Sequence, residues 1–147
     1  MATPPELVRS TGYLLYKAGL KSQRGLDDAL APTGLSVREF MVLAFASGAE
    51  LSQQDVARRL SLDPTLVVAA VDTLEQRGLV ERRRDPRDRR RYLLVVSDEG
   101  RAFVREAEEA AARAEDELLA ALSPTQRTQL QKLLRTALAP SLPWLRE

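Results

Sequence analysis

Residues 51–96 read LSQQDVARRLSLDPTLVVAAVDTLEQRGLVERRRDPRDRRRYLLVV and contain two short helical patterns, an arginine-rich turn and an apolar strand. The first pattern begins at Ser52, whose hydroxyl can accept a hydrogen bond from a free N–H of the first helical turn. The second begins at Asp63-Pro64, because a capping aspartate precedes a proline whose fixed φ suits the first helical position. Gly78 is expected to end it, since glycine readily adopts the left-handed conformation of a helix C-terminus.

The second helix has one apolar face at the 3.6-residue spacing. The residues expected to pack inward are Val67, Ala70, Val71 and Leu74. The residues expected to face outward or to lie at the flanks are Thr65, Leu66, Val68, Ala69, Asp72, Thr73 and Gln76. A second helix that follows a tight turn and presents small side chains fits the DNA major groove in helix-turn-helix proteins.

The chain that follows predicts a β-hairpin with concentrated positive charge. Residues 80–83 and 92–96 read as strands, and residues 85–88 read as a turn. Between Arg77 and Arg91 there are eight arginines and three acidic residues, a net charge of +5, whereas the whole chain carries +1. A charge run is often only a solvated surface. Directly after a helix-turn-helix pattern, however, arginines match phosphate oxygens and narrow minor grooves, so we predict a DNA-binding wing.

Residues 51–100 resemble the MarR family of dimeric winged helix-turn-helix repressors. In that family two helices precede an RGLVER segment, a wing with the motif DPxDRR and a strand that closes with T/SxxG. This chain has RGLVER at 77–82, DPRDRR at 85–90 and SDEG at 97–100. The helices outside these motifs agree in length and order, so the resemblance covers nearly the whole chain.

The resemblance implies a mainly α fold with a small β-wing. The winged helix-turn-helix DNA-binding domain is expected at 35–98, and a helical dimerisation region at 1–34 and 99–147. The function that it implies is that of a sequence-specific repressor, which binds double-stranded DNA at a palindromic operator as a homodimer. The alternative is a winged-helix protein-interaction adaptor; the apolar recognition face supports it, and the +5 wing counts against it.

The composition of the chain excludes several other classes of protein function. The chain has no cysteine and no histidine, which removes disulfides, thiol redox sensing and the usual zinc ligands, so we predict no metal and no cofactor. The uncharged run at 40–49 is shorter than the ~20 residues of a membrane helix, and the first ten residues lack an apolar signal core. A cytoplasmic protein without a membrane partner is expected. With no evident nucleophile, base or phosphate-binding loop, enzymatic activity is not expected.

Long helical patterns flank the predicted DNA-binding domain. Residues 5 to about 30 read as one helix with a bend near Gly25. Capping boxes at Ser36 and Ser123 open two further helices, and residues 98 to about 121 form an acidic one between them. Their apolar stripes can pair across a two-fold axis or within an intrachain bundle. The MarR resemblance favours the homodimer, whose operator half-sites would lie ~10 bp apart.

The expected surface faces and the resemblance together predict the DNA contacts. The helix starts at Ser52 and Asp63 are expected to hold phosphates through backbone N–H groups. Arg90 matches the minor-groove arginine of the family, and Asp88 matches the aspartate that braces it. Arg87, Arg89 and Arg91 are expected to contact phosphates or to brace the strands. The predicted contact set is Ser52, Gln53, Thr65, Leu66, Val68, Ala69, Thr73, Gln76, Arg87, Arg89, Arg90 and Arg91.

The recognition helix departs from the family at two positions. Val68 and Ala69 stand where many relatives carry serine and arginine. Base reading is therefore expected to rely on thymine methyl contacts and on DNA shape.

MarR-like proteins commonly bind small aromatic or phenolic acids between the dimerisation helices and the DNA-binding domain, and then release DNA. By this resemblance the candidate effector-binding residues are Tyr13, Tyr16, Arg24, Phe40 and Phe45, with Arg24 neutralising a carboxylate. The alternative is that these aromatic residues are ordinary core. Without cysteine or histidine, peroxide and zinc signals are not expected, which leaves an organic effector or none.

Overall fold

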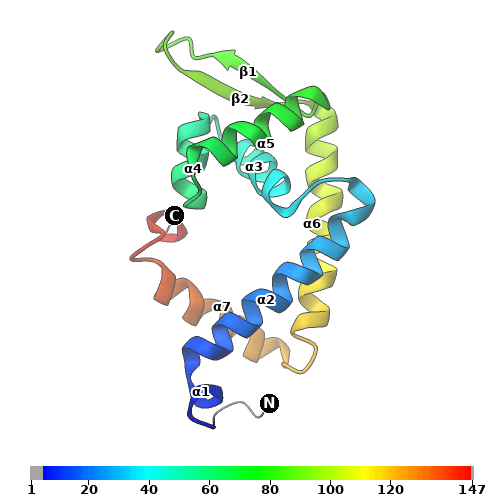
Figure 1. The fold of residues 1–147 in the computed structure, drawn as a ribbon, viewed down its shortest axis with the longest axis vertical. Helices are drawn as coiled ribbons and strands as arrows, with labels where there is room; N and C mark the ends of the chain where they lie inside the picture. Colours follow the sequence, from blue (N-terminus) through cyan, green and yellow to red (C-terminus); the bar gives the residue numbers. More distant parts are fainter. Residues whose placement is uncertain (1–4, 147) are drawn as a thin grey trace.

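The computed structural model describes residues 5–146, which form a mainly helical fold with one small sheet (Figure 1). The helices are α1 (Pro5–Arg9), α2 (Thr11–Leu30), α3 (Val37–Gly48), α4 (Gln53–Leu60), α5 (Pro64–Gln76), α6 (Asp98–Leu118) and α7 (Pro124–Leu138), with 3-10 turns η1 (Ala31–Thr33) and η2 (Pro143–Arg146). Strands β1 (Val80–Arg84) and β2 (Tyr92–Val96) pair antiparallel, with Val80 opposite Val96. The predicted fold class is confirmed. Residues 1–4 and 147 of the predicted dimerisation region lie outside the described residues.

Polar caps fix the helix starts at the predicted positions. Ser36 Oγ accepts from the N–H of Glu39 at 3.3 Å, and Glu39 Oε2 accepts from the N–H of Ser36 at 2.8 Å, so the two residues form a capping box. Caps also begin α4, α5 and α7 at Ser52, Asp63 and Ser123. Short-range chemistry therefore places most of the helices along the chain.

The N-terminal helix differs from the predicted single helix over residues 5–30. Ser10 interrupts it, because the serine hydroxyl accepts from the N–H of Tyr13 at 3.4 Å and caps α2. Serine favours caps over helix interiors, since its side chain competes for backbone groups. The helix continues through Gly25, which lies where α2 crosses α6; an added Cβ there would be 3.4 Å from the Cβ of Ala114.

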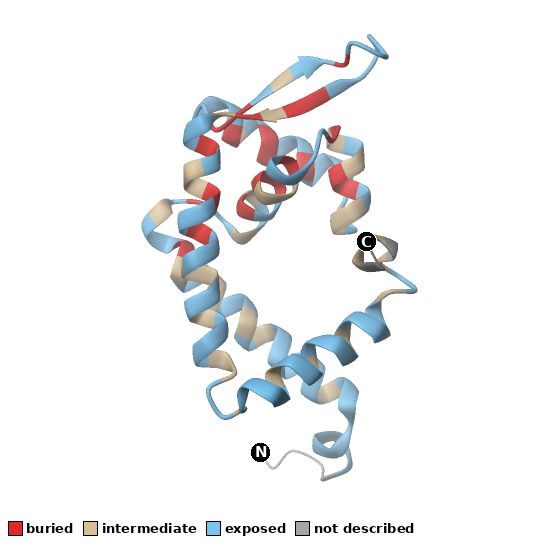
Figure 2. Ribbon diagram, turned by 180° about the vertical axis from the view of Figure 1, so that it is seen from behind, coloured by how far each residue is buried: buried red, intermediate tan, exposed pale blue. Residues whose placement is uncertain are grey.

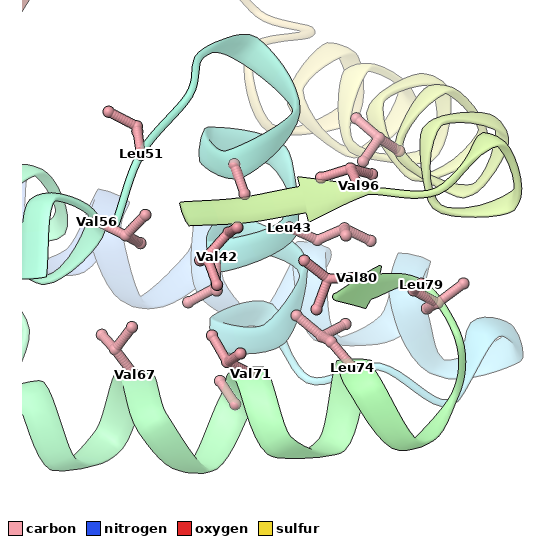
Figure 3. Packing of buried hydrophobic residues seen from close by; sticks show 14 of the residues in the cluster. Val42, Leu43, Leu51, Val56, Val67, Val71, Leu74, Leu79, Val80 and Val96 are labelled. Atoms are coloured by element: carbon pink, nitrogen blue, oxygen red, sulfur yellow. The ribbon is translucent and has the colours of Figure 1, made fainter. Parts of the chain in front are cut away.

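The main core lies between α3, α5 and the hairpin (Figure 3). All four residues predicted to face inward from α5 are buried: Val67, Ala70, Val71 and Leu74. Figure 3 shows that Val67, Val71 and Leu74 converge with Val42 and Leu43 of α3, and that β2 covers the cluster with Val96. Helix α5, the predicted recognition helix, is thus packed into the core by its inner face, and its outer face is exposed to solvent.

Burial is uneven along the molecule (Figure 2). The buried segments gather in the half that contains α3, α5 and the hairpin, whereas α7 has no buried residue and α2 has only Leu30, at its end. Leu30 joins Phe40 and Ala107 in a small second cluster, which connects α2 and α6 to α3.

The C-terminal turn η2 returns to the half of the molecule that contains α3, α5 and the hairpin, and it lies near α4 in Figure 1. The indole N–H of Trp144 donates to the carbonyl of Arg59 at 2.8 Å, and its ring meets Phe45 edge-to-face with centroids 5.2 Å apart.

Within residues 5–146, no single helix is long and apolar enough to span a bilayer. Taken as a pair, Thr11–Thr33 and Val37–Gly48 reach that length and composition, but they are bent by 81° at the break between them. The apolar content of α3 is accounted for by the core to which it contributes.

Candidate DNA-binding surface

Helix α5 presents a small, mostly apolar outer face. Leu66 and Val68 are 39% and 41% exposed, and Thr65, Ala69 and Gln76 are exposed beside them. The hydroxyl of Thr73 donates to the carbonyl of Ala69 at 3.2 Å, so its proton is used within the helix. Such a face can contact thymine methyl groups but offers few donors to base edges.

A hollow of about 320 Å³ lies beside this face, where α4 and α5 begin and β2 starts. It collects predicted contact residues from three separate elements: Ser52, Gln53, Val68, Arg90 and Arg91. Tyr92 closes one side. The fold therefore places two helix starts and two wing arginines around one concave surface.

Two aspartates shape the wing loop. Asp88 Oδ1 accepts from the backbone N–H of Arg90 at 3.0 Å, so the predicted brace acts on the main chain of this arginine. The sequence prediction placed Asp85 in the DPRDRR motif but gave it no role; Asp85 is 4% exposed and accepts from the N–H of Arg87 at 2.8 Å. The Asp-Pro pair at a turn is the signal that could have identified it, because aspartate commonly bonds the backbone two residues ahead.

The backbone N–H of Arg87 lowers the pKa of the Asp85 carboxyl, and partial burial opposes this effect. The nearby charges of Arg87 and Arg91 lower it further, so the net pKa lies below the ordinary value of 3.8. Asp85 is therefore a fixed negative charge at the base of the loop.

The wing arginines divide into two groups. Among the described residues, the guanidinium groups of Arg89 and Arg90 make no ion pair, and both side chains are exposed. Arg91 instead reaches α4, where it pairs with Asp55 Oδ2 at 2.7 Å. Arg87 lies 3.5 Å from carboxylate oxygens of both Glu50 and Asp85. In the part of the chain that the structure describes, Arg89 and Arg90 are thus free of ion pairs, while Arg91 ties the wing to α4.

The Asp55 carboxylate links the start of α4 to the wing. Partial burial raises its pKa, but the hydroxyl and N–H of Ser52 and the guanidinium of Arg58 lower it more strongly. The charge of Arg91 adds to this effect, so the net pKa of Asp55 lies below its ordinary value of 3.8. The carboxylate therefore stays ionised at neutral pH.

Comparison with known proteins identifies this arrangement. The family model described as "MarR family" matches residues 33–91. HTH-type transcriptional repressor Rv2887 of Mycobacterium tuberculosis is 31% identical over 124 residues, which cover 84% of this chain and 89% of the relative. The chain belongs to the MarR family. Members of this family are DNA-binding transcription regulators, so this MarR-family chain is a regulator and not an enzyme.

Two solved structures show the same fold with ligands in place. CouR from Rhodococcus jostii RHA1 bound to p-coumaroyl-CoA has 34% identity and a TM-score of 0.82, covering 91% of this chain and 95% of that one. CouR bound to a 23-mer DNA duplex has 33% identity and a TM-score of 0.84, covering 93% and 98%.

A second site feature of this MarR-family chain escaped the sequence prediction. Arg82 Nε donates to Gln53 Oε1 at 2.6 Å, and the same guanidinium forms ion pairs with Asp72 and Glu75. The side-chain oxygen of Gln53, a predicted DNA contact, is thus already hydrogen-bonded within the protein. No local pattern signals this cluster, because its members come from α4, α5 and β1.

The five candidate effector residues do not come together within one chain. Phe40 is buried in the second core cluster, and Phe45 packs on Trp144. Tyr16 is 62% exposed, Arg24 is exposed and Tyr13 is half-buried, all on α2. An apolar hollow of about 400 Å³ does lie between α2, α6 and α7, and none of the five lines it.

Proposed function

We propose that this chain is a repressor that binds a palindromic operator as a homodimer and that an aromatic organic effector releases it from DNA. The observation that carries the DNA-binding part is the hollow where Gln53, Val68 and Arg90 meet, together with the lack of any ion pair at Arg89 and Arg90 among the described residues. In this arrangement α5 enters the major groove, and Arg90 reaches the adjacent minor groove.

Charge supports this docking. The hairpin region from Arg77 to Arg91 carries +5, while the remainder of the chain is net negative. A surface of this kind binds polyanions through counterion release, so affinity should fall steeply as salt rises. Helix α6 carries eight acidic and three basic residues along its length, and this net negative charge disfavours its approach to phosphates.

The exposed apolar residues of the terminal helices support the homodimer. Leu14 and Leu15 of α2 are 56% and 48% exposed, and Leu133 and Leu138 of α7 are 60% and 44% exposed. In the proposed dimer these residues form one apolar surface, of the kind that is usually covered by another protein surface. A two-fold axis through residues 1–34 and 99–147 would place two copies of α5 about one DNA turn apart, so operator half-sites would be ~10 bp apart.

The effector part rests on similarity. CouR was solved with p-coumaroyl-CoA, an aromatic acid joined to a large anionic carrier. An aromatic acid or its CoA thioester is therefore the first class of effector to test. In the proposed dimer, the predicted residues Tyr13, Tyr16 and Arg24 would lie near the partner's helices.

The test is fluorescence anisotropy with a labelled duplex from the region upstream of the gene, measured over a salt series. Arg90→Ala should weaken binding and flatten the slope of log affinity against log salt by about one unit. Arg83→Ala is the matched control, because Arg83 lies in the same hairpin but pairs with Glu81. A wild-type protein that ignores duplex DNA at low salt, or an unchanged slope for Arg90→Ala, contradicts the proposal.

A further inference from the structure

Arg82 is bonded to three other side chains and connects the three elements of the DNA-binding surface. It lies on β1 with 21% of its side chain exposed. Its Nε donates to Gln53 Oε1 of α4 at 2.6 Å, and its two terminal nitrogens form ion pairs with Asp72 and Glu75 of α5. Its backbone N–H also donates to Glu75 Oε1 at 3.0 Å. A planar guanidinium has a fixed set of donors, so these bonds define the relative placement of α4, α5 and the wing.

The bond to Gln53 fixes the orientation of a predicted DNA contact. A guanidinium only donates, so the carboxamide oxygen must face Arg82 and the NH₂ group must face the other way. Gln53 lines the 320 Å³ hollow of the DNA-binding surface. Its NH₂ group is not used by Arg82 and is available to donate on that side, to phosphate oxygens or acceptor atoms of bases.

The ion pairs have a separate effect on charge. Asp72 and Glu75 are one turn apart on α5 and both are exposed, by 53% and 39% of their side chains. Two unpaired carboxylates on a helix that enters a groove would repel the phosphates on either side. Arg82 draws both toward β1 and neutralises one of the two charges.

We propose that Arg82 is a positioning residue for DNA recognition. It fixes α5 against the wing, turns the Gln53 NH₂ group toward DNA and holds the carboxylates of Asp72 and Glu75 away from phosphates, without contacting DNA itself. This inference rests on the proposed function, in which α5 lies in the major groove.

The experiment compares variants by anisotropy on the same upstream duplex, with the folded fraction checked by circular dichroism. Arg82→Met should weaken binding about tenfold, a size typical of residues that act through a contact network. Its salt slope should stay that of the wild type, because no phosphate contact is lost. Arg83→Met is the matched control, since this neighbour is exposed and pairs only with Glu81 among the described residues.

Two further variants test positioning, and a third, Arg82→Lys, is used if the first substitution destabilises the fold. Gln53→Ala should weaken binding in the wild-type background but add little to Arg82→Met, because Gln53 is already misoriented there. Asp72→Asn with Glu75→Gln should restore part of the binding lost in Arg82→Met. If Arg82→Met lowers the folded fraction, Arg82→Lys replaces it; lysine keeps the charge but cannot bond all three partners in one plane.

The outcomes distinguish this inference from the function on which it rests. A wild-type chain that binds no duplex at low salt overturns both. Wild-type binding together with unchanged affinity of Arg82→Met, strictly additive losses with Gln53→Ala, or no recovery from the double carboxylate substitution overturns the role of Arg82 alone.

Discussion

Apolar side chains are buried in residues 35–98, called the head below. On the terminal helices α2 and α7 several of them are exposed. In the head, Leu43, Val71 and Leu74 are 0% exposed, whereas Leu14 on α2 and Leu133 on α7 are more than half exposed. Figure 2 shows the same contrast over the whole molecule. The head contains most of the main core, to which Val104 of α6 also contributes, and the terminal helices α2 and α7 have apolar surface that needs a partner. The shape of each DNA-binding surface should therefore depend on a single chain. The distance between the two copies of α5 should depend on how two chains pair in the proposed dimer.

The largest effect is expected in the head core. Leu74→Ala removes a fully buried side chain from the inner face of α5 and should lower the free energy of unfolding by about 2–5 kcal/mol. Leu66→Ala, on the outer face of the same helix, should change it by less than about 1 kcal/mol. Urea unfolding followed by circular dichroism measures both. Equal losses would mean that the two faces of α5 are not distinguished by packing.

A substitution on the exposed face of a terminal helix should weaken the proposed dimer and leave the fold of each chain intact. Leu133→Lys places a charge on the exposed apolar face of α7 and should weaken the proposed dimer about 10–100-fold, or about 1.4–2.7 kcal/mol. Gln131→Lys, on the opposite side of α7, is the matched control and should leave assembly unchanged. Analytical ultracentrifugation over a dilution series gives the association constants. If both variants sediment like the wild type, the α7 face is not the dimer surface.

Trp144 joins the two regions and offers a way to test whether they unfold together. It is the single tryptophan of the chain, and its ring lies against Phe45 with its N–H bonded to the carbonyl of Arg59. One hydrogen bond and one edge contact contribute about 1–2 kcal/mol. We expect tryptophan emission to change at lower urea than the circular dichroism of the helices. Coincident transitions would show that the C-terminal turn belongs to the same cooperative unit as the head.

The sequence predicted those features of the head that depend on neighbours along the chain. The apolar spacing of Val67, Val71 and Leu74 marked the buried face of α5, and the serine caps Ser36 and Ser52 marked the starts of α3 and α4. The break at Ser10 was missed, because a serine in a helical pattern is compatible with either a helix interior or a cap.

Contacts between distant elements could not be predicted in this way. Arg82 meets Gln53 across 29 positions and Arg91 meets Asp55 across 36, and neither spacing has a periodic signature. For the same reason the sequence grouped Tyr16, Phe40 and Phe45 as one effector site, although the fold separates them. Residue type identified candidates there, but only tertiary packing decides which of them meet.

The smallest expected effect concerns pH and the bond between α4 and the wing. The folded pKa of Asp55 lies below its ordinary value of 3.8, so folding favours the ionised carboxylate. Its contribution is therefore present above the unfolded pKa of about 3.9 and is lost as pH falls through the lower, folded pKa. Asp55→Asn keeps an acceptor for the cap but loses the ion pairs with Arg58 and Arg91, and should cost about 1 kcal/mol at pH 7.

The difference between wild type and Asp55→Asn should shrink in urea unfolding at pH 5, 4 and 3, in that order. Gln54→Ala, an exposed neighbour without a titrating group, should show a constant difference over the same range. Because Asp55 ties the wing to α4 inside a single chain, the pH dependence should be unchanged when Leu133→Lys is added. A dependence that vanishes with Leu133→Lys would mean that the head is not independent of the terminal helices, and the contrast between the two regions would have to be abandoned.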